Sequence, residues 1–201
     1  MYPRLCLEMK TGIISDGSAE AQALEHLVTR MRCPKFFPLK PVYADMQPYS
    51  PIPQIVRAAQ SRVALLNRRG AERHLVILDR EANDACPGEF ANRLKVEFER
   101  RGMPNVAVVM KDRAFENWLI ADMSSLLRGA HRRIAISDRI VERISASGAD
   151  NVNALAILNG CVKDGYNKRR DAIEICKIVD PAVLARNSRS FRKFLAVAQA
   201  G

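Results

Sequence analysis

The chain has 201 residues, of which 48% are hydrophobic and 27% charged, a mixture that excludes intrinsic disorder and allows a sizeable core. Its formal net charge of +10 favours polyanionic partners, above all nucleic acid. No run approaches the roughly 18 apolar residues of a membrane span, and the start lacks the apolar stretch of a signal peptide, so we expect a cytoplasmic protein with no membrane partner.

Cysteine and histidine are poorly placed for a disulfide framework or a zinc site. The 5 cysteines are scattered without paired spacing, and the 3 histidines are isolated from one another. Any metal site in this chain must therefore use oxygen ligands.

The first part of the chain predicts a strand, a turn and a helix. Residues 10–15 form a short apolar run, Asp16-Gly17-Ser18 is typical of a turn, and residues 19–32 have apolar side chains at helical spacing. The proline-rich segment 33–53 allows only a short strand near Leu39 to Tyr43, and a second helix should run from Pro53 to a glycine stop at Arg69-Gly70.

Two more buried strands are expected, at 74–78 and 106–110, with a helix at about 88–102 between them. Strands that alternate with helices indicate an α/β fold, with a mainly parallel sheet flanked by helices.

The rest of the chain is predicted to be helical, over 115–127, 137–147, 152–162, 171–178 and 190–198. No flexible linker separates it from the sheet. We therefore expect an α/β core at residues 1–122 and a helical, basic C-terminal portion at 123–201 that packs on the core. Residues 111–201 contain 16 basic and 10 acidic side chains, against 16 and 12 in residues 1–110.

Carboxylates follow the predicted strands. In parallel sheets, ligands bind at the carboxyl ends of the strands. The acids expected at this edge are Asp16, Glu20, Asp79, Glu81, Asp112 and Glu116. If the backbone stays extended after Leu78, Asp79 and Glu81 point to the same side. Two or three such carboxylates suffice for Mg²⁺.

Each of these acids also has an alternative explanation in which it has only a structural role. Asp16 before a glycine is a common turn former, and Glu20 suits the N-terminus of a helix. Glu81 fits a solvated loop, and Glu116 can pair with Lys111 or Arg113 at the surface. Asp79 is harder to explain in this way, because a carboxylate directly after a buried strand needs a partner.

Three segments together resemble the Toprim superfamily, in particular small Toprim-like proteins of bacterial defence loci that are related to overcoming-lysogenization-defect nucleases. They are Ile13-Ile14-Ser15-Asp16-Gly17-Ser18-Ala19-Glu20, Leu75-Val76-Ile77-Leu78-Asp79-Arg80-Glu81, and Phe115-Glu116-Asn117-Trp118-Leu119-Ile120-Ala121-Asp122. The segments Tyr166-Asn167-Lys168 and Ser188 to Phe194 are similar to the tail of the same small family.

The resemblance implies a Toprim-like sheet and phosphodiester hydrolysis that depends on Mg²⁺ or Mn²⁺. The catalytic residues would be Asp16, Glu20 and Arg80, and the metal ligands would be Asp16, Asp79, Glu81 and Glu116. Lys111 and Arg113 would join Arg80 in neutralising charge on the phosphate.

The basic residues expected to bind nucleic acid are Lys111, Arg113, Lys168, Arg169, Arg189, Arg192 and Lys193. Tyr166 or Phe191 would offer a face for base stacking. The alternative is a solvated basic surface with Phe191 and Phe194 in the core, and Trp118 is more typical of a core anchor than of a stacking platform.

Two departures from the family pattern keep a second function open. Relatives have glutamate in place of Asp16 and two aspartates in place of Asp79 and Glu81. The alternative is thus a catalytically degenerate Toprim subunit that binds nucleic acid or an ATPase partner. A phosphatase or nucleotidyl enzyme for small phosphates is a third reading. No glycine-rich Walker loop is present, so ATP hydrolysis by this chain is not expected. DNA or RNA as substrate and the oligomeric state stay open.

Overall fold

The computed structural model describes residues 9–81, 86–128 and 133–200. Within them lies a five-stranded sheet, in which every pairing between strands is parallel. The path is β2 (Phe36–Pro38), β1 (Met9–Ser15), β4 (Arg73–Asp79) and β5 (Val106–Lys111), and β3 (Val42–Tyr43) pairs with the far end of β1. The mainly parallel α/β fold predicted from the sequence is confirmed.

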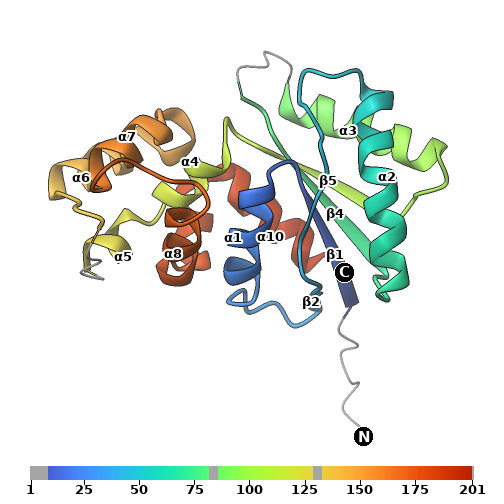
Figure 1. Cartoon of the computed structure of the whole chain (residues 1–201), viewed down its shortest axis with the longest axis horizontal. Helices are drawn as coiled ribbons and strands as arrows, with labels where there is room; N and C mark the ends of the chain where they lie inside the picture. The colour runs from blue at the N-terminus through green and yellow to red at the C-terminus, as the bar shows by residue number, and fades with distance from the viewer. Residues whose placement is uncertain (1–8, 82–85, 129–132, 201) are drawn as a thin grey trace, which may run out of the picture.

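Alternate residues of the central strands face opposite sides of the sheet. Ile14, Val76, Leu78 and Val108 contribute to one apolar cluster, together with α2 (Ile52–Arg68) and α3 (Pro87–Arg100). The other face contributes Ile13, Leu75, Ile77 and Val109 and is covered by α1 (Ser18–Val28) and α10 (Arg189–Gln199). Figure 1 shows these two helical layers with the sheet between them.

The helices after β5 extend the layer on the α1 side. They are α4 (Phe115–Ile120), α5 (Met123–Arg128), α6 (Asp138–Ser147), the 3₁₀ turn η1 (Ala149–Asn151), α7 (Ala154–Cys161), α8 (Asp171–Ile178) and α9 (Pro181–Asn187). Helix α8 packs against α1 (Figure 1), and the apolar side chains of these helices belong to the same cluster as that sheet face. The C-terminal portion and the sheet thus share one core.

Trp118 anchors this shared core. Its ring packs edge-on against Phe191 and is stacked with Phe194, and its indole N–H donates a 2.8 Å hydrogen bond to Ser190 Oγ. All three aromatic rings are fully buried. Burial of the indole and its satisfied N–H make Trp118 a core anchor, as sequence statistics favoured. In the same way, Phe191 is buried and is not available for base stacking.

Two expectations about element boundaries differ from the structure. The single helix expected over 115–127 is split into α4 and α5, with a turn at Ala121 and Asp122, and Asp122 accepts a hydrogen bond from the Ser125 backbone N–H. The short strand expected near Leu39 to Tyr43 is reduced to β3, directly after Pro41, and a separate strand, β2, ends at Pro38 before the expected range. Proline has no N–H to donate to the ladder.

No helix among the described residues has the length and apolar character needed to cross a membrane. The cysteines that the structure describes, Cys33, Cys86, Cys161 and Cys176, are free thiols.

His74 is a buried histidine in the middle of the sheet. It lies in β4 beside Gly12, where an added Cβ would come within 3.0 Å of the imidazole Cδ2. Neither ring nitrogen has a hydrogen-bond partner among the described residues. Burial lowers the pKa of His74, because the charged ring would lose its hydration.

We expect His74→Leu to make the protein less sensitive to acid. The unfolded chain takes up a proton at His74 near pH about 6.5, whereas the folded protein resists it, so wild-type stability falls as the pH drops below that value. The stability advantage of His74→Leu over wild type should therefore grow between about pH 7.5 and about pH 5. Urea unfolding at both pH values measures it, with His26→Gln as a second histidine replacement. Parallel pH profiles for wild type and His74→Leu would contradict the prediction.

Candidate functional site

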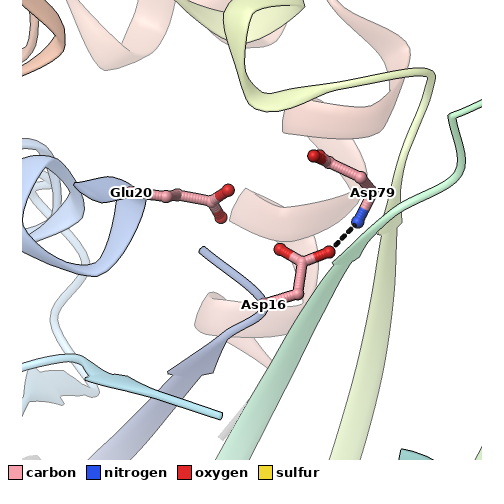
Figure 2. A group of neighbouring side chains, drawn as sticks. All are labelled: Asp16, Glu20 and Asp79. Carbon is pink, nitrogen blue, oxygen red and sulfur yellow. Dashed lines mark hydrogen bonds between the residues drawn. The ribbon is translucent and has the colours of Figure 1, made fainter. Parts of the chain in front are cut away.

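Three carboxylates meet at the carboxyl edge of the sheet. Asp16 directly follows β1, Asp79 ends the neighbouring strand β4, and Glu20 lies in the first turn of α1. One carboxylate oxygen from each lies within 4.8 Å of the other two. Figure 2 shows the three side chains converging from β1, β4 and α1. We call this cluster the acid triad.

Local backbone contacts fix these side chains. The Asp79 backbone N–H donates a 2.6 Å hydrogen bond to Asp16 Oδ2, drawn in Figure 2. Ser15 Oγ accepts a 3.2 Å hydrogen bond from the Gly17 N–H, which shapes the turn into α1. Glu20 is four and seven residues before Leu24 and Leu27, on the buried face of α1. The helical repeat therefore directs Glu20 towards the sheet.

Lys111 lies at the centre of the acid triad. It is the last residue of β5, in register with Asp79, and its side chain is 0% exposed. Its Nζ lies 2.9 Å from Asp16 Oδ1 and 2.9 Å from Asp79 Oδ1 and also contacts Glu20 Oε2. The expectation that Lys111 binds nucleic acid at the surface is therefore wrong, because the buried ammonium is already held by three carboxylates.

The site carries surplus negative charge. Three carboxylates and one ammonium leave a net charge of −2 when all four are ionised. Burial raises the pKa of Glu20, and burial together with the charge of Asp16 raises the pKa of Asp79 to about 6, even though Lys111 opposes both shifts. In turn, burial would lower the pKa of Lys111, but the three carboxylates outweigh it and raise that pKa.

Two oxygens of the triad have no hydrogen-bond partner among the described residues. They are Glu20 Oε1 and Asp79 Oδ1, and the latter touches Lys111 Nζ in an ion pair without hydrogen-bond geometry. Buried carboxylate oxygens normally have such partners. Hard oxygen ligands, three carboxylates against one ammonium, and a Glu20 oxygen without a partner among the described residues together fit a divalent cation such as Mg²⁺.

A pocket of about 310 Å³ opens beside the acid triad. Besides the triad its walls include Glu81, Phe115, Glu116, Tyr166 and Lys168. Glu116 is buried and pairs with Lys168, with Glu116 Oε1 3.1 Å from Lys168 Nζ. Glu116 is thus an acid of the pocket wall with a lysine partner, and the proposed pairing of Glu116 with Lys111 or Arg113 is not what the structure has.

Glu81 and Arg80 follow β4 in a bent loop. Glu81 has a φ of 52°, so the backbone does not stay extended after Asp79 and the argument that placed both acids on one side was wrong. Glu81 nevertheless lines the pocket. Arg80 points to Asp112, at 3.3 Å, and Arg189 contacts the other oxygen of Asp112 at 2.8 Å. Asp112 therefore joins two arginines and does not line the pocket.

The remaining basic residues predicted to bind nucleic acid are exposed. Arg113 is in the loop after β5, Arg169 precedes α8, and Arg192 and Lys193 lie on the outer side of α10. None of these four lines the pocket beside the acid triad. Their contact with nucleic acid stays a prediction.

The chain belongs to a family described as a domain of unknown function (DUF4276), whose model matches residues 16–197. No curated protein and no solved structure matches the chain. The matched range includes the acid triad, Lys111 and the helices up to α10.

Proposed function

We propose that this protein is a metal-dependent phosphodiesterase that acts on nucleic acid. The observation that carries the proposal is the acid triad around Lys111, whose three carboxylates outnumber the single ammonium and leave surplus negative charge beside an open pocket. A divalent cation would balance that charge, and the formal charge of +10 on the whole chain favours a polyanionic substrate.

A Toprim-type nuclease is the particular class that we propose. The parallel sheet, with acids after β1 and at the end of β4, agrees with the motif order on which the resemblance rests. Asp16, Glu20 and Asp79 would hold Mg²⁺ or Mn²⁺, and a bound cation supplies Lewis acidity towards a phosphate oxygen.

The chain's own residues would perform the remaining steps. Lys111 holds the three carboxylates together in the free protein. Burial raises the pKa of Glu20 at the pocket wall, so its carboxyl group keeps a proton to higher pH than an ordinary glutamate and is suited to accept or return one. Arg80 is tied to Asp112 and would act on the substrate only after leaving that ion pair.

Cleavage assays on DNA and RNA test the proposal. Wild type should cut one of these polymers with Mg²⁺ or Mn²⁺ and stop on chelation. Glu20→Gln should lower the rate at least about 100-fold, the scale of a lost acid–base group. Glu25→Gln is the matched control, because it removes a partly exposed glutamate from the same helix. Equal rates for Glu20→Gln and wild type would refute the assigned site.

The alternative is a degenerate subunit that binds nucleic acid or an ATPase without cutting. The specific observation in its favour is the ammonium of Lys111 at the centre of the acid triad, where it already neutralises part of the charge. Binding of nucleic acid that survives chelation, with steep salt dependence and no cleavage under any metal, would select this alternative.

A further inference from the structure

The turn between α7 and α8 forms a second wall of the pocket. It contributes a phenol and an ammonium group, whereas the acid triad contributes carboxylates. Its residues Tyr166 and Lys168 line the same pocket as Asp16, Glu20 and Asp79, although they come from the C-terminal portion of the chain. This wall has no part in holding the triad together.

Tyr166 offers a hydrogen bond that the free protein does not use. Its hydroxyl oxygen is buried and has no hydrogen-bond partner among the described residues. Burial and the nearby charge of Glu116 raise the pKa of Tyr166, so the hydroxyl keeps its proton and stays a donor. A buried donor without a partner destabilises the fold. A ligand oxygen that reaches the hydroxyl from the pocket that Tyr166 lines would satisfy it.

Lys168 supplies the positive charge that an anionic ligand needs here. The pocket is lined by five carboxylates, those of Asp16, Glu20, Asp79, Glu81 and Glu116, and Lys168 is the one cationic side chain among the described lining residues. Its side chain is 59% exposed, and its Nζ is 3.1 Å from Glu116 Oε1. Glu116 thus holds the ammonium at the rim, where it remains accessible to solvent and to ligands.

We propose that Tyr166 and Lys168 are the phosphate-recognition pair of this pocket. The Tyr166 hydroxyl donates to a non-bridging phosphoryl oxygen, and the Lys168 ammonium pairs with the charge of the same group. This inference rests on the proposed function and narrows its substrate class. A pocket of about 310 Å³ is at the small end of ligand sites. That volume fits about one nucleotide unit, such as one presented by a single strand or a free end.

Equilibrium binding of thymidine 5′-monophosphate tests the pair without requiring turnover. Calorimetry in the presence of Mn²⁺ compares wild type, Tyr166→Phe, Lys168→Gln and the control Lys163→Gln, an exposed lysine of the same turn that does not line the pocket. Tyr166→Phe and Lys168→Gln should each weaken binding about tenfold or more, the scale of a hydrogen bond to a charged group. Lys163→Gln should bind like wild type, and thymidine without phosphate should bind no variant measurably.

Thermal unfolding separates recognition from a structural role. Tyr166→Phe removes an unpaired buried hydroxyl, so its Tm should equal or exceed that of wild type while its nucleotide affinity falls. A lower Tm with unchanged affinity would show a structural residue and overturn the inference.

The inference and the proposed function fail in different ways. If wild type binds the nucleotide through Tyr166 and Lys168 but never cleaves, the recognition pair stands and the phosphodiesterase is refuted. If wild type cleaves nucleic acid but Tyr166→Phe and Lys168→Gln leave nucleotide affinity and KM unchanged, the recognition pair is refuted alone. Absence of nucleotide binding by wild type also overturns the pair.

Discussion

Replacing Lys111 with methionine should destabilise the metal-free protein by about 3–5 kcal/mol, the usual effect of removing one partner from a buried ion-pair network. Methionine has a similar length and no charge, so the change isolates the ammonium. It leaves the carboxylates of Asp16, Glu20 and Asp79 within 4.8 Å of one another without a cation. Urea unfolding in the presence of a chelator measures the loss, and Lys163→Met is the control for an exposed lysine.

Divalent cations should restore much of the stability lost in Lys111→Met. With the ammonium gone no cation balances the triad, so Mn²⁺ should raise the Tm of Lys111→Met more than that of wild type. Equal Tm increases in both proteins would mean that the cation binds elsewhere, and the acid triad would lose its assignment as a metal site.

Replacing Asp79 with asparagine should lower the cleavage rate by about three orders of magnitude, because the site loses a metal ligand and the charge that attracts the cation. Mn²⁺ affinity, measured by calorimetry, should fall in parallel. Asp138→Asn, in the first turn of α6 and remote from the pocket, is the control and should behave like wild type in both assays. Wild-type cleavage by Asp79→Asn would exclude this residue from the reaction.

In the metal-free protein the same substitution should increase stability at neutral pH. The pKa of Asp79 is raised to about 6, so its stabilising contribution is complete below the unfolded value near 4 and is lost as the pH rises through about 6. Asparagine does not ionise and avoids that loss. The stability difference between Asp79→Asn and wild type should therefore grow from about pH 4 to pH 7, with an upper bound of about 3 kcal/mol. If Asp79 served only to stabilise the fold, Asp79→Asn would instead be less stable than wild type at neutral pH.

The sequence was sufficient to predict the sheet and the approach of three acids to one another, those of Asp16, Glu20 and Asp79. The reason is physical. Apolar runs that end abruptly in an acid mark buried parallel strands, and the ends of parallel neighbours lie at the same edge. Glu20 was expected at this edge because it comes soon after the first strand, and the structure directs it there from the buried face of α1 that it shares with Leu24. These local patterns contain enough information to place three side chains together.

Lys111 is the residue of the site whose position this reasoning predicted wrongly. Lysine is almost never fully buried without a partner, so a basic residue after an apolar run was assigned to the surface. The missed signal was strand parity: Lys111 is two residues after Val109, which faces the α1 side of the sheet, and it is in register with Asp79. Tyr166 and Lys168 were harder still, because their approach to the triad depends on how α8 packs on α1.

The position of α10 has a consequence for synthesis on the ribosome. This helix is the last element before residue 200, yet it packs against β5 and buries Phe191 and Phe194 under the sheet face that bears Asp79 and Lys111. A nascent chain that has emerged only as far as α9 has a finished set of strands with part of one apolar face still open to water. This half of the core is therefore complete only after α10 has emerged, and until then the uncovered apolar surface lies on the strands around β5.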